Sequence, residues 1–313
     1  MLRHILRRLL LAIPTLFVVI TIIFVLVRVI PGDPAVAALG DQASEQAIDQ
    51  LREQLGLDKP IWQQYIDYMA GLLQGDFGNS MISRSPAWDQ IVGVLPHSLE
   101  LAAAAIIIAL ALGIPTGIVT AIKRNTWIDY TGRVLSLAGL SAPAFYIGIL
   151  LIYIFAARLG WFPAIGAGDF SDPGANLRAL VLPALTLGLV ETAFVARMTR
   201  SVMLNVLSDD YVRTARAKGL TERSVLVRHA FRAALVPVVG LIGLFAIALI
   251  GSSVLTEEVF ARPGLGKLMI GAVRQRDYTL LQAVMVVYAI IIVIINILVD
   301  LIYTYVDPRV RRS

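Results

Sequence analysis

The residue types that most often carry catalysis or bind metals are scarce in this chain. Cysteine is absent, so no disulfide, cysteine-ligated zinc site or thiol nucleophile can form. The three histidines, His4, His97 and His229, are scattered and match no metal-binding pattern such as His-x-x-Glu-His. No nucleophile stands in a recognisable arrangement with a base. We therefore expect neither a catalytic centre nor a metal site.

Gly266 and Lys267 invite comparison with a phosphate-binding loop. A Walker loop requires Gly-x-x-x-x-Gly-Lys followed by Ser or Thr. Ala261 stands at the position of the first glycine, and Leu268 replaces the hydroxyl residue. We therefore expect this chain to bind no nucleotide or other cofactor and to have no enzyme activity of its own.

The composition indicates a membrane protein. Apolar residues make up 58% of the 313 positions and charged residues 16%, whereas soluble domains carry about 45–50% and about 25%. A soluble core of this size cannot bury that excess. The net charge of +5 does not indicate a nucleic-acid partner, because the basic residues flank apolar segments and do not cluster with base-stacking aromatics.

Six segments are apolar over about 20 residues, the length that a helix needs to cross a bilayer. They cover residues 9–29, 99–122, 134–157, 179–196, 236–255 and 283–303. The fourth is the least regular, because Pro183 and Glu191 interrupt it. The first follows a basic start, but it exceeds the about 7–15 apolar residues of a secretory signal, so we predict an uncleaved span. In the second, Gly113 and Gly117 form a small-xxx-small pattern that predicts close helix packing.

Lysine and arginine are distributed unevenly among the segments that join the spans. They are most frequent at both ends of the chain and in residues 123–133 and 197–234. The positive-inside rule places these parts in the cytoplasm, so both termini are predicted to be cytoplasmic. The predicted organisation is a tail and first helix (1–29), an extracytoplasmic loop (30–98), a five-helix core (99–303) with a cytoplasmic loop (197–234), and a cytoplasmic tail (304–313).

The extracytoplasmic loop is acidic and opens on the turn Pro31-Gly32-Asp33-Pro34. Residues 44–55 and 61–73 have helical patterns, with Gly56 suited to end the first helix and Pro60 to start the second. Two compatible interpretations remain open. The loop is either a small structural cap or a docking surface for a soluble partner.

The cytoplasmic loop predicts a short helix, a glycine and a second helix. Asp209 or Asp210 can cap a helix that ends at Gly219, and Thr221 can cap the next. The second helix has one apolar stripe, made of Val227, Ala230, Phe231, Ala234 and Leu235. This pattern fits an interfacial amphipathic helix or a contact for a cytoplasmic partner, and it does not decide between them.

A resemblance favours the second interpretation. The stretch Tyr211-Val212-Arg213-Thr214-Ala215-Arg216-Ala217-Lys218-Gly219-Leu220, followed by Arg228-His229-Ala230-Phe231-Arg232 and Leu235-Val236-Pro237, resembles the cytoplasmic coupling loop of ABC-importer permeases. The broad family pattern is Glu-Ala-Ala, three residues and Gly. Here Arg213-Thr214-Ala215 precedes Gly219, and the interval to Pro237 is longer, as in the dipeptide/oligopeptide/nickel branch.

Other stretches extend this resemblance over nearly the whole chain. They are Leu9-Leu10-Leu11-Ala12-Ile13-Pro14, Pro31-Gly32-Asp33-Pro34, Leu55-Gly56-Leu57-Asp58-Lys59-Pro60, Gly75-Asp76-Phe77-Gly78, Arg262-Pro263-Gly264-Leu265-Gly266, Arg276-Asp277-Tyr278, Asp300 and Asp307-Pro308-Arg309. Each stretch is weak evidence alone, but together they are specific.

The resemblance implies an all-α, type I ABC importer permease with six transmembrane helices in the bacterial inner membrane. Such a subunit pairs with a second homologous permease to form a pore. Two ATPase subunits, which use ATP and magnesium, bind beneath it, and an extracytoplasmic solute-binding protein delivers the cargo. Peptides are the expected cargo, with dipeptides, oligopeptides and glutathione all open, and nickel is an alternative. Outside this family, the alternative is an ion-gradient-driven secondary transporter.

The expected site residues fall into three groups. The ATPase-coupling contact is predicted at Arg213, Thr214, Ala215, Arg216, Ala217, Lys218, Gly219, Val227, Ala230 and Phe231. An outer gate or docking loop is predicted at Arg262, Pro263, Gly264, Gly266 and Lys267, where basic residues run against the positive-inside trend. Among charges within or beside spans, Glu191 and Asp300 are expected to pair with basic residues, whereas Arg28 and Glu100 are expected to reach the membrane surface.

Overall fold

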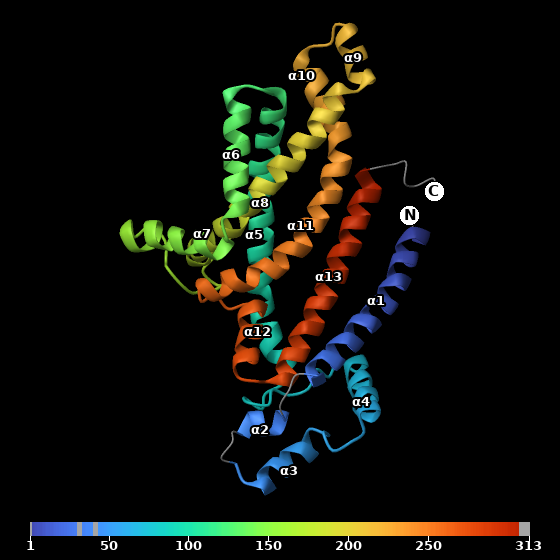
Figure 1. The fold of residues 1–313 in the computed structure, drawn as a ribbon, viewed down its shortest axis with the longest axis vertical. Helices are drawn as coiled ribbons and strands as arrows, with labels where there is room; N and C mark the ends of the chain where they lie inside the picture. The colour runs from blue at the N-terminus through green and yellow to red at the C-terminus, as the bar shows by residue number, and fades with distance from the viewer. Residues whose placement is uncertain (1, 30–32, 40–42, 307–313) are drawn as a thin grey trace. The chain divides into compact units, whose positions relative to one another are not determined.

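Helices make up nearly all of the computed structural model, which describes residues 2–29, 33–39 and 43–306 (Figure 1). The α-helices are α1 (Leu2–Val29), α2 (Pro34–Leu39), α3 (Glu45–Gln54), α4 (Ile61–Leu73), α5 (Ala87–Ile122), α6 (Trp127–Ser141), α7 (Ala144–Leu151), α8 (Pro173–Ser208), α9 (Asp210–Ala217), α10 (Glu222–Ser224), α11 (Arg232–Val259), α12 (Leu265–Arg274) and α13 (Tyr278–Val306). There are also two π-helices: η1 (Ile152–Arg158) continues α7, and η2 (Val225–Phe231) connects α10 to α11. The described residues form no strand, which confirms the all-α prediction.

Four single helices are long and apolar enough to cross a membrane. They are Arg8–Val29, Ala87–Ile122, Pro173–Ser208 and Tyr278–Ile302. Two bent pairs also qualify if each pair is one span: Trp127–Ser141 with Ala144–Arg158, and Glu222–Gly240 with Phe245–Val259. Each of the six predicted segments lies on one of these helices or pairs, so the described chain carries between four and six spans.

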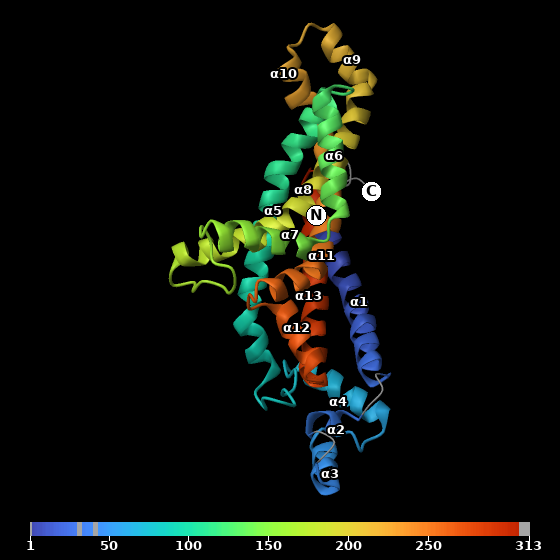
Figure 2. The same cartoon turned by 60° about the vertical axis from the view of Figure 1, so that its left-hand side comes forward.

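The third predicted span is sharply bent. The axes of the two halves, which meet between Ser141 and Ala144, differ by 99°, and both views show α7 turned away from α6 (Figures 1 and 2). Pro143 has no amide hydrogen, and its ring disfavours helical backbone at the preceding residue. Ala142 accordingly adopts an extended φ of −85° and ψ of 127°. One continuous helix over residues 134–157 is therefore not formed.

The fourth predicted span, in contrast, is unbroken. α8 runs for 36 residues through Pro183. The carboxylate of Asp172 accepts a hydrogen bond from the amide of Ala175 at 3.0 Å, and Pro173 occupies the first turn, where no amide donor is needed. Because α8 continues to Ser208, the first residues of the predicted cytoplasmic loop, 197–208, are the end of this helix.

The helices of the first compact unit pack around α8. This unit comprises Met1–Leu6, His97–Pro263 and Ile294–Ser313, and in it α8 contacts α6, α7 and α11. A Cβ atom at Gly113 would lie 2.7 Å from the Cβ of Val195, and one at Gly117 would lie 2.6 Å from the carbonyl oxygen of Ala196. The predicted close packing at this glycine pair is therefore confirmed, with α8 as the neighbour.

The second compact unit joins segments that the predicted organisation had separated. It comprises Arg7–Pro96 and Gly264–Val293. Ala87 and Ile91 share a buried apolar cluster with residues of α12 and α13, and Ile23 of α1 shares another with Val286 and Ala289. These clusters explain why residues 264–293 belong with the N-terminal part and not with the core.

The two helices predicted in the extracytoplasmic loop are present as α3 and α4. The hydroxyl of Ser44 accepts from the amide of Ala47 at 3.3 Å, and Gly56 ends the first helix with a φ of +63°. The short helix α2 was not predicted. Pro31 and Gly32 of the predicted turn, and residues 307–313 of the predicted tail, lie outside the described residues.

Candidate functional site

The predicted coupling loop is a compact helical hairpin. α9 and α10 meet at Gly219, whose φ of +78° lies in the left-handed region that favours glycine. The Arg216 guanidinium donates to both oxygens of the Glu222 carboxylate, at 3.2 and 2.8 Å, and so ties α9 to α10. Both views show this hairpin at the end of α8 and α11 (Figures 1 and 2). The predicted helix stop at Gly219 is confirmed.

The hairpin has its own small apolar core. Val212, Ala215 and Val225 form a buried cluster, against which Val206 and Leu207 of α8 pack. This core packs the hairpin against the end of α8. A contact at the hairpin can therefore act on a helix that runs through the centre of the first unit.

The second helix of the loop departs from the predicted register. Val225–Phe231 is π-helical, so residues five apart share a face. Val225 and Ala230 are accordingly both fully buried, whereas Val227 is 58% exposed. The predicted stripe that grouped Val227 with Ala230 is wrong, because it assumed α-helical spacing.

The predicted contact residues therefore divide into two sets. Arg213, Thr214, Arg216, Ala217, Lys218, Gly219 and Val227 are exposed. Ala215 and Ala230 are buried and support the fold of the hairpin, so they offer no surface to a partner, and Phe231 is half-buried. Tyr211 and Leu220, which were not predicted, add exposed apolar area at 43% and 41%.

The predicted outer loop is largely buried. Arg262 is completely buried in the first unit, and its Nη2 donates to the Glu100 carboxylate at 2.5 Å. The expectations that Arg262 forms part of a docking surface and that Glu100 reaches the membrane surface are therefore wrong. Gly264 and Gly266, in the second unit, are also buried, while Pro263 and Lys267 are half-buried. A gating role for this loop stays a prediction.

Asn176 and Glu257 add to the polar environment of Arg262. Glu100 also accepts from the amide of Asn176 at 2.5 Å. Glu257, fully buried on α11, accepts from the hydroxyl of Ser98 at 2.7 Å and interacts electrostatically with Arg262. Burial of the guanidinium lowers the pKa of Arg262, and the two carboxylates oppose that shift. Sequence reasoning missed Glu257, because an acidic residue at a span end gives no sign of its distant partner.

Glu191 forms no ion pair of the predicted kind within the described part of the chain. It is half-buried on α8 and makes no hydrogen bond or ion pair with any residue that the structure describes. Arg197 and Arg200 lie six and nine residues further along the helix, not at the spacing of three or four that brings side chains together. Asp300 lies in α13, and its pairing stays a prediction.

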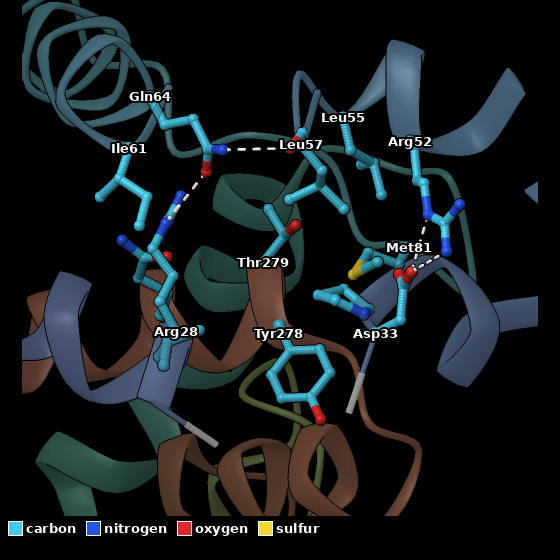
Figure 3. A pocket seen from close by; sticks show the side chains of 13 residues that line it. Arg28, Asp33, Arg52, Leu55, Leu57, Ile61, Gln64, Met81, Tyr278 and Thr279 are labelled. Carbon is cyan, nitrogen blue, oxygen red and sulfur yellow. Dashed lines mark hydrogen bonds and ion pairs between the residues drawn. The ribbon is translucent and has the colours of Figure 1, made fainter. Parts of the chain in front are cut away.

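The second unit contains a cavity of about 480 Å³ beside the ends of α1, α4 and α13 (Figure 3). On one side the Arg28 guanidinium donates to the side-chain oxygen of Gln64 at 3.1 Å. On the other, Arg52 donates to Asp33 at 2.7 Å. Burial raises the pKa of Asp33, but hydrogen bonds from Arg52 and from the Ala35 amide outweigh it and hold that pKa below its usual value. Arg28 thus lies at the wall of this cavity and is hydrogen-bonded to a side chain.

Comparison with known proteins decides the family. Residues 113–312 match the family described as binding-protein-dependent transport system inner membrane component, and residues 1–102 match its N-terminal region. This chain belongs to that family. The resemblance to ABC-importer permeases is therefore confirmed, and the permease is a multi-pass protein of the bacterial inner membrane.

Two relatives align with the permease from end to end. The glutathione transport system permease protein GsiC of Escherichia coli K12 is 41% identical over 99% of both chains. The dipeptide transport system permease protein DppB of Alkalihalophilus pseudofirmus is 40% identical over 99% of this chain and 100% of its own. Both relatives therefore match the permease over nearly its whole length.

Solved structures confirm the fold. A chain of the MetNI methionine ABC transporter, in an inward-facing conformation, superposes with a TM-score of 0.58 at 22% identity, covering 69% of the permease and 96% of that chain. An amino acid ABC transporter crystallised with histidines gives a TM-score of 0.54 at 17% identity. The type I ABC importer permease fold predicted from the sequence is thus confirmed.

Proposed function

We propose that this permease is the pore-forming subunit of an ATP-driven importer of peptides. The observation that carries the proposal is full-length similarity, at about the same identity, to one relative named for glutathione and another named for dipeptides. Glutathione is itself a short peptide, so the substrate class common to both relatives is a short peptide. Nickel as cargo and ion-gradient coupling have no comparable support.

The coupling hairpin supports an ATPase partner on the cytoplasmic side. Its exposed rim combines basic side chains at Arg213 and Lys218 with apolar area at Tyr211, Leu220 and Val227. A rim of this kind suits docking into a groove of another protein. Its buried core would pass a movement of that groove to α8. In this scheme two ATPases bind and hydrolyse ATP with magnesium, and this chain binds neither ATP nor magnesium.

The remaining partners follow from the same scheme. A second, homologous permease completes the pore, and an extracytoplasmic solute-binding protein delivers the peptide. The positive-inside bias supports six spans with both termini in the cytoplasm, which puts the coupling hairpin on the ATPase side and α3 and α4 on the side of the binding protein.

Purification of the tagged permease in mild detergent, with mass spectrometry of the co-purifying proteins, tests the proposal. We expect a second permease of the same family and one or two ATPases. A permease that purifies alone and remains folded would contradict it.

A further inference from the structure

The first unit contains a second, smaller cavity between α5, α6 and α8. Its volume is about 260 Å³, and most of its wall is apolar. The charged groups that line it are three guanidinium groups, those of Arg133 on α6 and of Arg197 and Arg200 on α8. The coupling hairpin and the cavity of Figure 3 lie elsewhere, so no part of the proposed transport cycle accounts for these arginines.

The Asp129 carboxylate neutralises only part of the positive charge of these three arginines. Asp129, fully buried at the start of α6, accepts from Nε and Nη2 of Arg200 at 2.7 and 2.9 Å. Nε of Arg133 forms a longer ion pair with the same carboxylate, at 3.7 Å, beyond hydrogen-bond distance. Arg197 has no carboxylate partner among the residues that the structure describes; its guanidinium lies 5.4 Å from the ring of Phe194. Asp129 is one carboxylate against three guanidinium groups, so the wall keeps an excess of positive charge for an external anion.

The face of α6 beside the cavity is strongly apolar and exposed. Leu137 lines the cavity and is 58% exposed. Val134, which is 64% exposed, Tyr130 and Trp127 precede it at intervals of three and four residues, so they lie on the same face of the helix. Trp and Tyr are enriched where helices meet the membrane–water interface. Lys123 and Arg124, just before α6, mark this end of the helix as the cytoplasmic one by the positive-inside rule. The arginine-lined cavity thus lies at the depth expected for lipid headgroups.

We infer that this cavity binds the phosphate headgroup of an anionic phospholipid, with the acyl chains lying along the exposed face of α6. Basic pockets between transmembrane helices on the cytoplasmic side are suited to anionic headgroups. The guanidinium groups of Arg133 and Arg197 supply the donors for the phosphate, and Arg200 is held by Asp129 as the fixed wall. A free phosphate ion would leave the adjoining apolar face unused, which is why a lipid fits the site better.

Native mass spectrometry of the detergent-purified, delipidated complex tests the inference. Phosphatidylglycerol and phosphatidylcholine are titrated separately onto the wild-type complex and onto the double variant Arg133→Gln, Arg197→Gln. Both arginines are exposed and neither hydrogen-bonds to Asp129, so the double variant is expected to fold. Arg178→Gln is the matched control, because Arg178 is an exposed arginine at the opposite end of α8.

We expect retention of one phosphatidylglycerol per permease in the wild type and in the control. Each basic residue near an anionic membrane surface contributes about a fivefold factor in affinity, so the double variant should bind about thirtyfold more weakly. Equal retention of phosphatidylcholine would overturn the inference. So would competition by millimolar inorganic phosphate alone, which would identify a free-ion site, or loss of a partner subunit from the double variant with lipid binding unchanged, which would identify a protein contact.

Discussion

Arg262 and Glu100 are joined by a 2.5 Å hydrogen bond although 162 positions separate them in the chain, and the guanidinium is completely out of contact with solvent. The pair links the segment after α11 to α5 within the first unit. Glu257 lies beside it as a second carboxylate. An arginine that the sequence pattern placed at the surface is therefore part of the internal structure of the transmembrane core.

Removing Arg262 is expected to destabilise the first unit severely. Arg262→Ala removes the cation beside the half-buried Glu100 and the fully buried Glu257, and breaking a buried pair in this way costs about 3–5 kcal/mol. Thermal denaturation of the purified complex measures the effect. Arg178→Ala is the control, because Arg178 is an exposed arginine on α8 outside the hairpin, where a substitution changes stability little. Equal melting temperatures for Arg262→Ala and the wild type would contradict the internal role.

Gly219 is expected to be needed for coupling and not for assembly. A Cβ atom there meets nothing within 4 Å, but valine at a φ of +78° costs about 1–2 kcal/mol of backbone strain and alters the rim of the hairpin. We expect the Gly219→Val variant to assemble with its partner subunits. It should lose transport and the stimulation of ATP hydrolysis that accompanies transport. Gly75→Val carries the same strain, at a φ of +80° in open space, outside the hairpin. If both variants transport equally, the coupling assignment fails.

The π-helical register at η2 makes opposite predictions for two neighbouring valines. Val225→Asp places a carboxylate in the hairpin core, which is expected to cost about 4 kcal/mol or more and to expose the hairpin to protease. Val227→Asp lies on the exposed side and should leave the hairpin folded while weakening recovery of the ATPase. Limited proteolysis and co-purification distinguish the two. If the Val227→Asp variant is sensitive to protease and the Val225→Asp variant is resistant, the result would support the α-helical register and contradict the π-helical one.

Glu191→Gln is expected to leave the complex folded. Because Glu191 forms no ion pair with the described residues, removing its charge breaks no bond, and the free energy of unfolding should change by less than about 1 kcal/mol. The same substitution at Glu100, which accepts from Arg262 and Asn176, should lower the melting temperature clearly. A larger loss for Glu191→Gln than for Glu100→Gln would show that Glu191 has a structural partner after all.

Local sequence signals predicted the elements well. Ser44, Gly56 and Gly219 mark helix ends by capping and backbone preferences that act over a few residues. The glycine pair at 113 and 117 likewise predicted close packing, although not the partner helix.

The features that the sequence did not reveal depend on longer-range contacts or on a changed helical spacing. The π-helical spacing of η2 places Val227 at the surface. Arg262 and Glu100 are far apart in the chain, and no periodicity in the sequence relates them. The bend at Pro143 was signalled by the proline, but prolines at 115 and 183 lie inside unbroken helices, so the residue type alone does not decide the outcome. Neighbouring helices decide whether a freed carbonyl is satisfied.

Transport in proteoliposomes tests the central claim most directly. The complex of this permease with its co-purified subunits and binding protein is reconstituted, and uptake of a labelled dipeptide is measured with ATP, with a non-hydrolysable analogue, and with an imposed proton or sodium gradient. We predict uptake that requires ATP hydrolysis and the binding protein and is lost in Gly219→Val. Uptake driven by the ion gradient in the absence of ATP would contradict the account.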